Sequence, residues 1–181
     1  MVQRYVTGST GIVVAVPQAE RAVVDVRARY DPAVGYGVPA HVTVLFPWLP
    51  VGSIGEADLD GLRVMAAATP AFDAELVTVG RFPKVAWLAP APSEAFAALT
   101  RTAWTRWPQC PPYGGLFDEP VPHLTIADGQ PDQVLDAVSA MVAPRLPIVF
   151  RVDALTVLAF DGVQWRQQAR FPLASVPEPG G

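Results

Sequence analysis

Apolar and polar residues follow one another in short runs along this chain, and the period of each run predicts a strand or a helix. Residues 11–16 (GIVVAV) and 41–46 (HVTVLF) are rich in β-branched side chains, which favour strands. Between them, residues 17–30 carry apolar side chains at helical spacing, with charged residues in between. This pattern predicts an amphipathic helix that begins at a proline.

The same patterns predict further elements of both kinds. We expect helices at 57–68, 93–107 and 131–142, and strands at 74–79, 85–88, 123–127, 148–160 and 163–171. The last two strands are separated by Asp161-Gly162, a dipeptide that is typical of hairpin turns. The 20 prolines and 14 glycines of the chain keep these elements short.

Part of the sequence occurs twice. The window LVTVGRFPKVAWL begins at residue 76, and ALTVLAFDGVQWR begins at residue 154, 78 residues later, so that the two align without a gap. Phe82 then matches Phe160, and Trp87 matches Trp165. Apolar alternation alone is common to many hairpins, but matched aromatic residues favour an internal duplication. We expect the two matched tryptophans to pack in the core.

The only two histidines lie in similar sequence contexts. His41 in PAHVTVLF and His123 in VPHLTIA each open a predicted strand just after a proline, and Thr43 or Thr125 follows two residues later. Residues i and i+2 of a strand project from the same face. Each imidazole therefore shares a face with a hydroxyl, and two repeats related by a pseudo-two-fold axis would bring both pairs to one cleft.

Two imidazoles and two hydroxyls suit attack on a phosphodiester. A neutral imidazole can take a proton from the attacking oxygen, and an imidazolium can donate one to the leaving oxygen. Threonine hydroxyls can donate hydrogen bonds to the non-bridging phosphate oxygens. This chemistry requires no metal or other cofactor, and the sequence contains neither an HExxH motif nor a cysteine cluster.

With two H-x-T-apolar motifs, one in each half of a duplicated chain, the sequence resembles the 2H phosphoesterase superfamily. Within it, the sequence is similar to the bacterial 2′-5′ RNA ligase-like proteins, or RNA 2′,3′-cyclic phosphodiesterases. The resemblance implies an α+β fold in which two antiparallel-rich sheets face a central groove, with helices outside. We expect a single bilobal domain of two pseudo-symmetric repeats over residues 1–176, followed by a flexible tail at 177–181.

By this resemblance, His41 and His123 are the catalytic acid/base pair, and Thr43 and Thr125 bind the phosphate. The expected enzyme is a metal-independent phosphodiesterase that acts on 2′,3′-cyclic phosphates or 2′-5′ linkages of nucleotides or RNA ends. Two alternatives remain open. One is a non-catalytic module that binds a nucleotide or RNA end, and the other is a metal-dependent hydrolase with both histidines and an acid such as Asp128 as ligands.

The charge balance argues against long nucleic acids as partners. The chain has 13 Lys and Arg residues against 17 Asp and Glu residues, a net charge of −4, whereas duplex-binding proteins need many cations to neutralise phosphates. A small nucleotide, an RNA terminus or an ADP-ribose-type cyclic phosphate suits this charge better. Four basic residues of the predicted hairpins are either groove cations or solvated charges: Arg81, Lys84, Arg166 and Arg170.

Three aromatic residues lie in the loops that precede the two motifs, Tyr36 before the first and Tyr113 and Phe117 before the second. Such side chains either stack on the base of a substrate or close over the core. We predict that they contribute to substrate binding.

The cellular setting is predicted from the lack of long apolar segments and from the low cysteine content. No apolar run approaches the roughly 18 residues of a membrane helix, and no signal-like apolar segment opens the chain. The single cysteine, Cys110, cannot form an internal disulfide, which favours a reducing compartment. We therefore expect a cytoplasmic monomer that binds no membrane.

Overall fold

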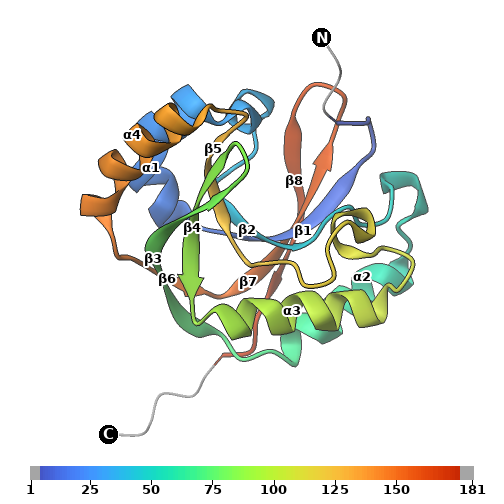
Figure 1. The fold of residues 1–181 in the computed structure, drawn as a ribbon. Coiled ribbons are helices and arrows are strands. Elements are labelled where there is room, and N and C mark those ends of the chain that lie inside the picture. The colour runs from blue at the N-terminus through green and yellow to red at the C-terminus, as the bar shows by residue number, and fades with distance from the viewer. Residues whose placement is uncertain (1–4, 176–181) are drawn as a thin grey trace, which may run out of the picture.

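Two four-stranded antiparallel sheets organise the chain, and the computed structural model describes them over residues 5–175 (Figure 1). The first sheet has the strand order β2-β1-β7-β8 and the second has the order β5-β4-β3-β6. The first sheet contains β1 (Thr10–Ala15), β2 (His41–Leu45), β7 (Ala154–Phe160) and β8 (Trp165–Pro172). The second contains β3 (Phe72–Phe82), β4 (Val85–Ala91), β5 (Leu124–Asp128) and β6 (Ile148–Val152). The predicted α+β fold with two antiparallel sheets is confirmed.

Four α-helices cover the sheets from outside: α1 (Pro17–Tyr30), α2 (Glu56–Ala67), α3 (Ser93–Arg106) and α4 (Asp132–Val142). The predicted boundaries of all four agree with these to within one residue. Short 3-10 helices lie in the connections: η1 (Pro32–Tyr36), η2 (Val51–Ser53), η3 (Pro112–Gly115) and η4 (Ala143–Arg145). Among the described residues, no helix has the length and apolar character needed to cross a membrane.

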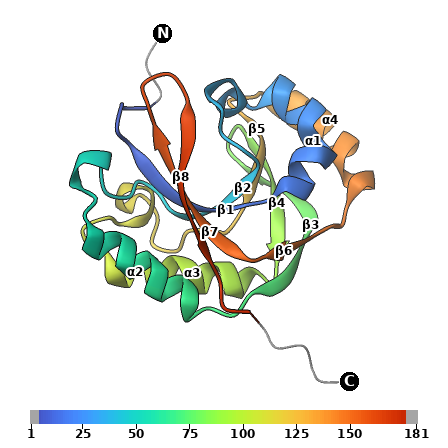
Figure 2. The same cartoon turned by 180° about the vertical axis from the view of Figure 1, so that it is seen from behind.

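The helices following β1 and β4 pack against the sheet to which those strands do not belong. α1 follows β1 of the first sheet but packs against β5 and β6 of the second, and α3 follows β4 of the second sheet but packs against β2 of the first. α2 packs on β8 and α4 on β4 (Figures 1 and 2). As a consequence, β2 and β5, which carry the two motifs, lie side by side at the centre of the molecule.

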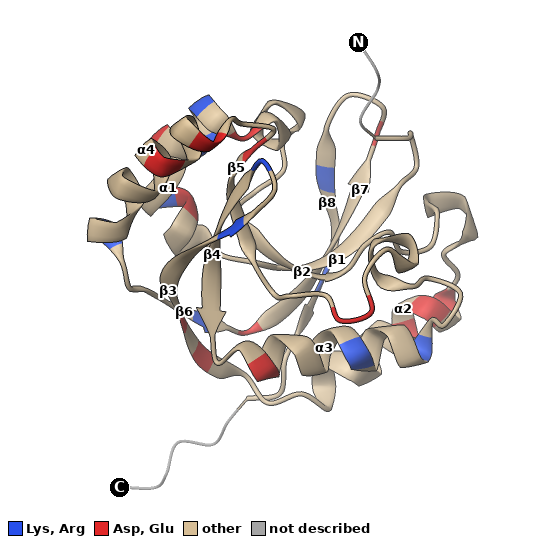
Figure 3. Cartoon of the chain, in the orientation of Figure 1, with Lys and Arg blue, Asp and Glu red and all other residues tan. Residues whose placement is uncertain are grey.

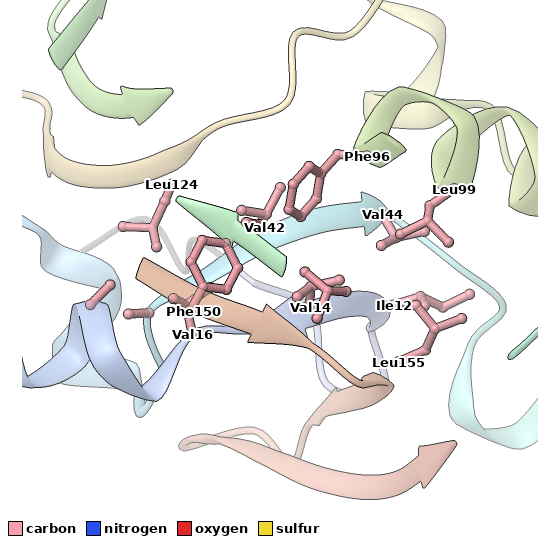
Figure 4. Close-up of a cluster of buried hydrophobic side chains, with 14 of the residues drawn as sticks. Ile12, Val14, Val16, Val42, Val44, Phe96, Leu99, Leu124, Phe150 and Leu155 are labelled. Carbon is pink, nitrogen blue, oxygen red and sulfur yellow. The ribbon is translucent and has the colours of Figure 1, made fainter. Parts of the chain in front are cut away.

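The larger of two apolar clusters among the described residues joins the two sheets. On β2, Val42 and Val44 are fully buried, and on β5 Leu124 and Ile126 are fully buried, as the alternation of the two motifs predicts. Figure 4 shows side chains of both sheets and of α3 packed together in this core. Each fully buried aliphatic side chain contributes about 1.5–3 kcal/mol. This burial orients each strand and leaves the motif histidines and threonines on the opposite face.

The segment 148–160 differs from the single long strand that its composition predicts. It forms two strands, β6 in the second sheet and β7 in the first, which are separated by Asp153. β6 is an edge strand with alternating buried and exposed residues, whereas every residue of β7 is buried between two neighbouring strands. The run of β-branched and aromatic residues predicts strand throughout, but the change of partner depends on contacts that are distant in sequence.

The motif strands also differ slightly from their predicted limits of 41–46 and 123–127. β2 ends at Leu45, because Pro47 lacks the N–H needed to extend the ladder beyond Phe46. β5 begins at Leu124, so that His123 lies immediately before the strand and not within it. The predicted tail at 177–181 lies outside the described residues.

The repeated hairpin window corresponds only in part to the arrangement of the sheets. β3 and β7 hold the same third place in the two strand orders, and Phe82 and Phe160 end them. β4 holds the place of β1, however, while β8 is an edge strand like β6. Trp87 on β4 and Trp165 on β8 are therefore matched in sequence but do not occupy equivalent places in the sheets.

Candidate active site

The two histidines are held by the same local hydrogen bond. The Nδ1 atom of His41 lies 2.7 Å from the carbonyl oxygen of Pro39, and Nδ1 of His123 lies 2.7 Å from the carbonyl oxygen of Val121. A carbonyl oxygen can only accept a hydrogen bond, so that Nδ1 carries the hydrogen in both rings. In the neutral state, Nε2 of each ring is then the nitrogen that can accept a proton.

The threonines share faces with the histidines, as predicted. His41 and Thr43 lie opposite Ala15 and Val13 of β1, on the face of the first sheet that points away from the core. In the second sheet, Thr125 lies opposite Trp87 of β4. The two motifs therefore present their hydroxyls from equivalent strands, although their neighbours differ in size.

Each histidine lines a cavity of its own. The His41 cavity has a volume of about 100 Å³, and the His123 cavity has a volume of about 550 Å³. The His41 cavity is lined by Tyr5, Gly11, Val13, Val38, His41, Thr43, Phe46, Leu158 and Trp165. The His123 cavity is lined by Phe82, Pro83, Val85, Tyr113, Phe117, Glu119, Pro120, Val121, His123, Thr125 and Asp128.

Tyr113 lies between the two cavities. Its hydroxyl is hydrogen-bonded to the side chain of Thr43, and its ring is stacked near His123 with a centroid distance of 6.3 Å and an interplanar angle of 21°. The Tyr113 N–H also donates to the carbonyl oxygen of Phe46 at 2.6 Å. The expected single cleft is thus two neighbouring cavities, because the loop before β5 places this side chain between them.

Burial favours the neutral form of both imidazoles. Desolvation lowers the pKa of His41 to about 4, against the raising effect of the Pro39 carbonyl, and the positive charges of Arg27 and His123 lower it further while Asp31 raises it. Burial also lowers the pKa of His123, against the effect of the Val121 carbonyl. The effect of the His123 charge on the pKa of His41 indicates that the two rings are close enough to interact electrostatically.

A buried ion-pair network supports the backbone next to His41. Arg27 on α1 is only 1% exposed and forms salt bridges with Glu20 and Asp31. Its Nη2 also donates to the carbonyl oxygen of Val38, and the Glu20 carboxylate accepts a hydrogen bond from the N–H of Ala40. These bonds hold both sides of Pro39, whose carbonyl binds His41. This network is absent from the sequence-based predictions, although Arg27 and Asp31 stand four residues apart at the end of a predicted helix.

The aromatic residues that were predicted to bind substrate lie in different surroundings from one another. Phe117 is 57% exposed, lines the His123 cavity and packs edge-to-face against Tyr113, with a centroid distance of 5.8 Å. Tyr36 instead packs edge-on against Tyr5 and near Phe160, and is not among the lining residues of the His41 cavity. It therefore supports the wall behind that cavity.

The matched tryptophans both lie on the motif side of their sheets. Trp165 is 7% exposed, as expected for packing, yet it also lines the His41 cavity. Trp87 stacks on Phe82, and its ring centroid lies 6.0 Å from that of His123. Each tryptophan thus contributes to the surroundings of one histidine, which the prediction of simple core residues did not include.

The hairpin cations are not groove residues. Within residues 5–175, no Lys or Arg lines either cavity. Figure 3 shows charged residues on the helices and also on β8 and in the β3–β4 hairpin, while β1 and β2 are tan along their length. Lys84 lies in the turn between β3 and β4. The three arginines form ion pairs, namely Arg81 with Asp136, Arg166 with Asp161 and Arg170 with Asp153.

The metal-dependent alternative requires a third ligand near the two histidines. In the part of the chain that the structure describes, no three His, Cys, Asp or Glu side chains are grouped so that they could hold a metal ion. Asp128 lines the His123 cavity only. The ligand set that this alternative needs is therefore not assembled.

A match to a protein-family model shows the family of this chain. The model of the 2′-5′ RNA ligase superfamily matches residues 15–164, a segment that contains both motifs and most of both sheets. The chain belongs to the 2′-5′ RNA ligase superfamily. The predicted resemblance to 2H phosphoesterases is thereby confirmed. Among curated proteins, no sequence matches this member of the superfamily.

Several solved structures share the fold of this chain at low sequence identity. Escherichia coli LigT complexed with NADP+ has 16% identity and a TM-score of 0.57, over 94% of this chain and 99% of that one. The protein TT0787 of Thermus thermophilus has 20% identity and a TM-score of 0.57, over 92% and 98% of the two chains. E. coli LigT complexed with 3′-AMP has 15% identity and a TM-score of 0.54, again over 92% and 98%.

Proposed function

We propose that this protein is a metal-independent phosphodiesterase that acts on 2′,3′-cyclic phosphates or 2′-5′ linkages of nucleotides or RNA ends. The observation that carries the proposal is the matched setting of His41 and His123. Each ring is fixed through Nδ1 and keeps Nε2 for proton transfer, and each has a threonine on the same side of its sheet. Superfamily membership and the nucleotide-bound structures of LigT support a nucleotide substrate.

The proposed reaction needs one proton taken up and one given away. One neutral imidazole accepts a proton through Nε2 from the attacking water as the new P–O bond forms. The other, as an imidazolium, donates its Nε2 proton to the ribose oxygen as the old P–O bond breaks. Thr43 and Thr125 donate hydrogen bonds to the non-bridging oxygens, where negative charge is held in the transition state.

The proposal also includes the class of substrate, the cellular location and the oligomeric state. A small nucleotide or an RNA terminus is the expected substrate, since none of the described residues that line the two cavities is a Lys or Arg that could give a counter-charge to a long nucleic acid. A cytoplasmic monomer without a cofactor remains our expectation, on the single cysteine and on a reaction that needs only side chains.

The test is turnover of nucleoside 2′,3′-cyclic phosphates in the presence of EDTA. His41→Ala and His123→Ala should each lower kcat/KM by about 10²–10⁴-fold, because each removes a proton-transfer group. Thr125→Ala should lower it by a smaller factor, and Thr105→Ala on the exposed side of α3 is the matched control. Unchanged turnover in either histidine variant would contradict the proposal. Nucleotide binding without any turnover would favour the non-catalytic module.

A further inference from the structure

A third cavity lies between the start of α1 and the strands β6, β7 and β8. Its volume is about 210 Å³. This is below the range of about 300–1,000 Å³ for sites of small organic molecules, but several times the volume of about 30 Å³ that one water molecule takes in the liquid. Polar and charged side chains line much of it, namely Gln18, Arg151, Asp153, Thr156 and Arg170. None of its lining residues lines a histidine cavity.

This cavity lies on the same face of the first sheet as the first motif. Residues directly opposite one another in antiparallel strands project from the same face. Val13 lies opposite Thr43 on one side and opposite Thr156 on the other. Arg170 in turn lies opposite Thr156. Neighbouring strands are about 4.8 Å apart, so that the backbones of Thr43 and Thr156 are separated by about 10 Å.

Thr156 brings a buried hydroxyl to the cavity. Its residue is only 4% exposed and lines the cavity. Among the described residues, this hydroxyl has no hydrogen-bond partner. A buried hydroxyl without a partner is unfavourable, because it has lost its hydrogen bonds to bulk water. The position of Thr156 therefore indicates that a polar ligand is bound there.

The helix α1 begins at the cavity without a side-chain cap. Pro17 and Gln18 line the cavity, and the residue before them, Val16, has no side-chain group that could accept a hydrogen bond. The first N–H groups of a helix have no acceptor within the helix, and the partial positive charge at this end favours an anion. Since proline has no N–H, the N–H of Gln18 is the first that a ligand could use.

Two arginines add positive charge to the same cavity. Arg170 forms an ion pair with Asp153 at 2.9 Å, and Arg151 forms one with Asp73 at 2.8 Å. Each guanidinium has five N–H donors, so that its ion pair leaves others for a ligand. Of the two acids, only Asp153 lines the cavity. The lining therefore has two positive charges against one negative charge, whereas no described Lys or Arg lines a histidine cavity.

We propose that this cavity is a second anion site, which binds a phosphate group other than the one that reacts at the histidines. The oxygens of one phosphate can accept hydrogen bonds from the Thr156 hydroxyl, the Gln18 N–H and the Arg170 guanidinium at the same time. A carboxylate has only two oxygens and a single charge, and it suits this donor set less well. The group belongs either to the substrate, as a second phosphate, or to a free phosphate ion. Only the first of these sources rests on the proposed function.

Titration of the intact chain with inorganic phosphate, followed by ¹⁵N NMR, tests the site without any turnover. At constant ionic strength, with chloride as the balancing anion, phosphate should shift the Gln18 amide signal along a saturable curve. Thr156→Val and Arg170→Gln should each weaken this binding by about 10-fold or more, because each removes a hydrogen bond to a charged group. Arg166→Gln is the matched control, since Arg166 lies on the same strand and lines none of the three cavities. A Gln18 signal that does not respond, or an unchanged affinity in either variant, would overturn the proposal.

Kinetics on two substrates identify the source of the phosphate group. The comparison is between nucleoside 2′,3′-cyclic phosphates with and without a 5′-phosphate. If the substrate carries the group, Arg170→Gln should lower kcat/KM by about 10-fold for the 5′-phosphorylated substrate only. If neither value changes while inorganic phosphate still binds the parent protein, the site takes free phosphate. Turnover of neither substrate by the parent protein would contradict the proposed function, but the NMR result would still decide whether the anion site exists.

Discussion

Tyr113 and Thr43 share a hydrogen bond between their side chains, although they lie 70 residues apart in the sequence, at positions 113 and 43. Thr43 belongs to the first motif, while the ring of Tyr113 stacks near His123 of the second. This pair connects the two halves of the site and also separates the two cavities. Removing this hydrogen bond therefore tests how far the two halves of the site depend on each other.

Tyr113→Phe should keep the ring beside His123 and remove only the hydrogen bond. We expect a loss of about 0.5–1.5 kcal/mol in the free energy of unfolding, with a moderate fall in kcat/KM because Thr43 is no longer held. Urea unfolding and steady-state kinetics measure these effects. Tyr30→Phe on α1, which lines neither cavity, is the control. If Tyr113→Phe behaved like that control, the pair would have no role in joining the halves.

Arg27→Met should destabilise the fold strongly. It leaves the carboxylate of Asp31 buried without its guanidinium, which typically costs about 3–5 kcal/mol. It also removes a positive charge near His41, so that the pKa of His41 should rise while that of His123 changes little. Denaturant unfolding and NMR titration of the two histidines measure both effects.

Arg63→Met is the matched control for this substitution. Arg63 and Asp60 form an exposed pair on α2, for which a loss of about 0–1 kcal/mol is expected. Should Arg27→Met prove too unstable to study, Glu20→Gln weakens the same network at its half-buried end. Equal effects of the Arg27 and Arg63 substitutions would show that the buried network does not support the site.

The pH dependence of kcat/KM should be bell-shaped with an acidic optimum. One imidazole must be neutral and the other protonated, so that activity falls as the pH drops below the lower of the two pKa values and also as it rises above the higher one. Burial lowers the pKa of His41 to about 4 and also lowers that of His123 below the ordinary value of 6.5, so that both limbs lie on the acidic side. Initial rates at constant ionic strength measure the profile. An optimum above pH 8 would be incompatible with two-histidine catalysis in this setting.

Gly80→Ala should disturb the wall beside His123. A Cβ atom at residue 80 would lie 2.3 Å from the ring of Trp87, which packs against Phe82 and faces His123. Such overpacking costs about 1–3 kcal/mol, and the displaced ring should also lower kcat/KM. Thermal unfolding and kinetics on the cyclic phosphate are the measurements. Gly35→Ala, where a Cβ would meet nothing within 4 Å, is the control and should leave both unchanged.

The sequence alone determined the local arrangement of the site. The i, i+2 spacing of His41 and Thr43, with Val42 and Val44 between and after them, sets which side chains face the core and which face away. The same spacing holds for His123 and Thr125 in the second motif. Such alternation is a property of an extended backbone, so that it follows from neighbouring residues only. The helix limits were also predictable, because helical periodicity and proline positions are local signals.

Only the tertiary structure decided what surrounds the two motifs. The division of 148–160 between two sheets and the burial of Arg27 arise from packing between elements far apart in the chain. The same is true of Tyr113 between the cavities and of Trp165 in the lining of the His41 cavity. The two motifs are alike as sequences, yet one opens on a small cavity and the other on a large one. That difference comes from side chains contributed by other strands and loops, which local periodicity does not specify.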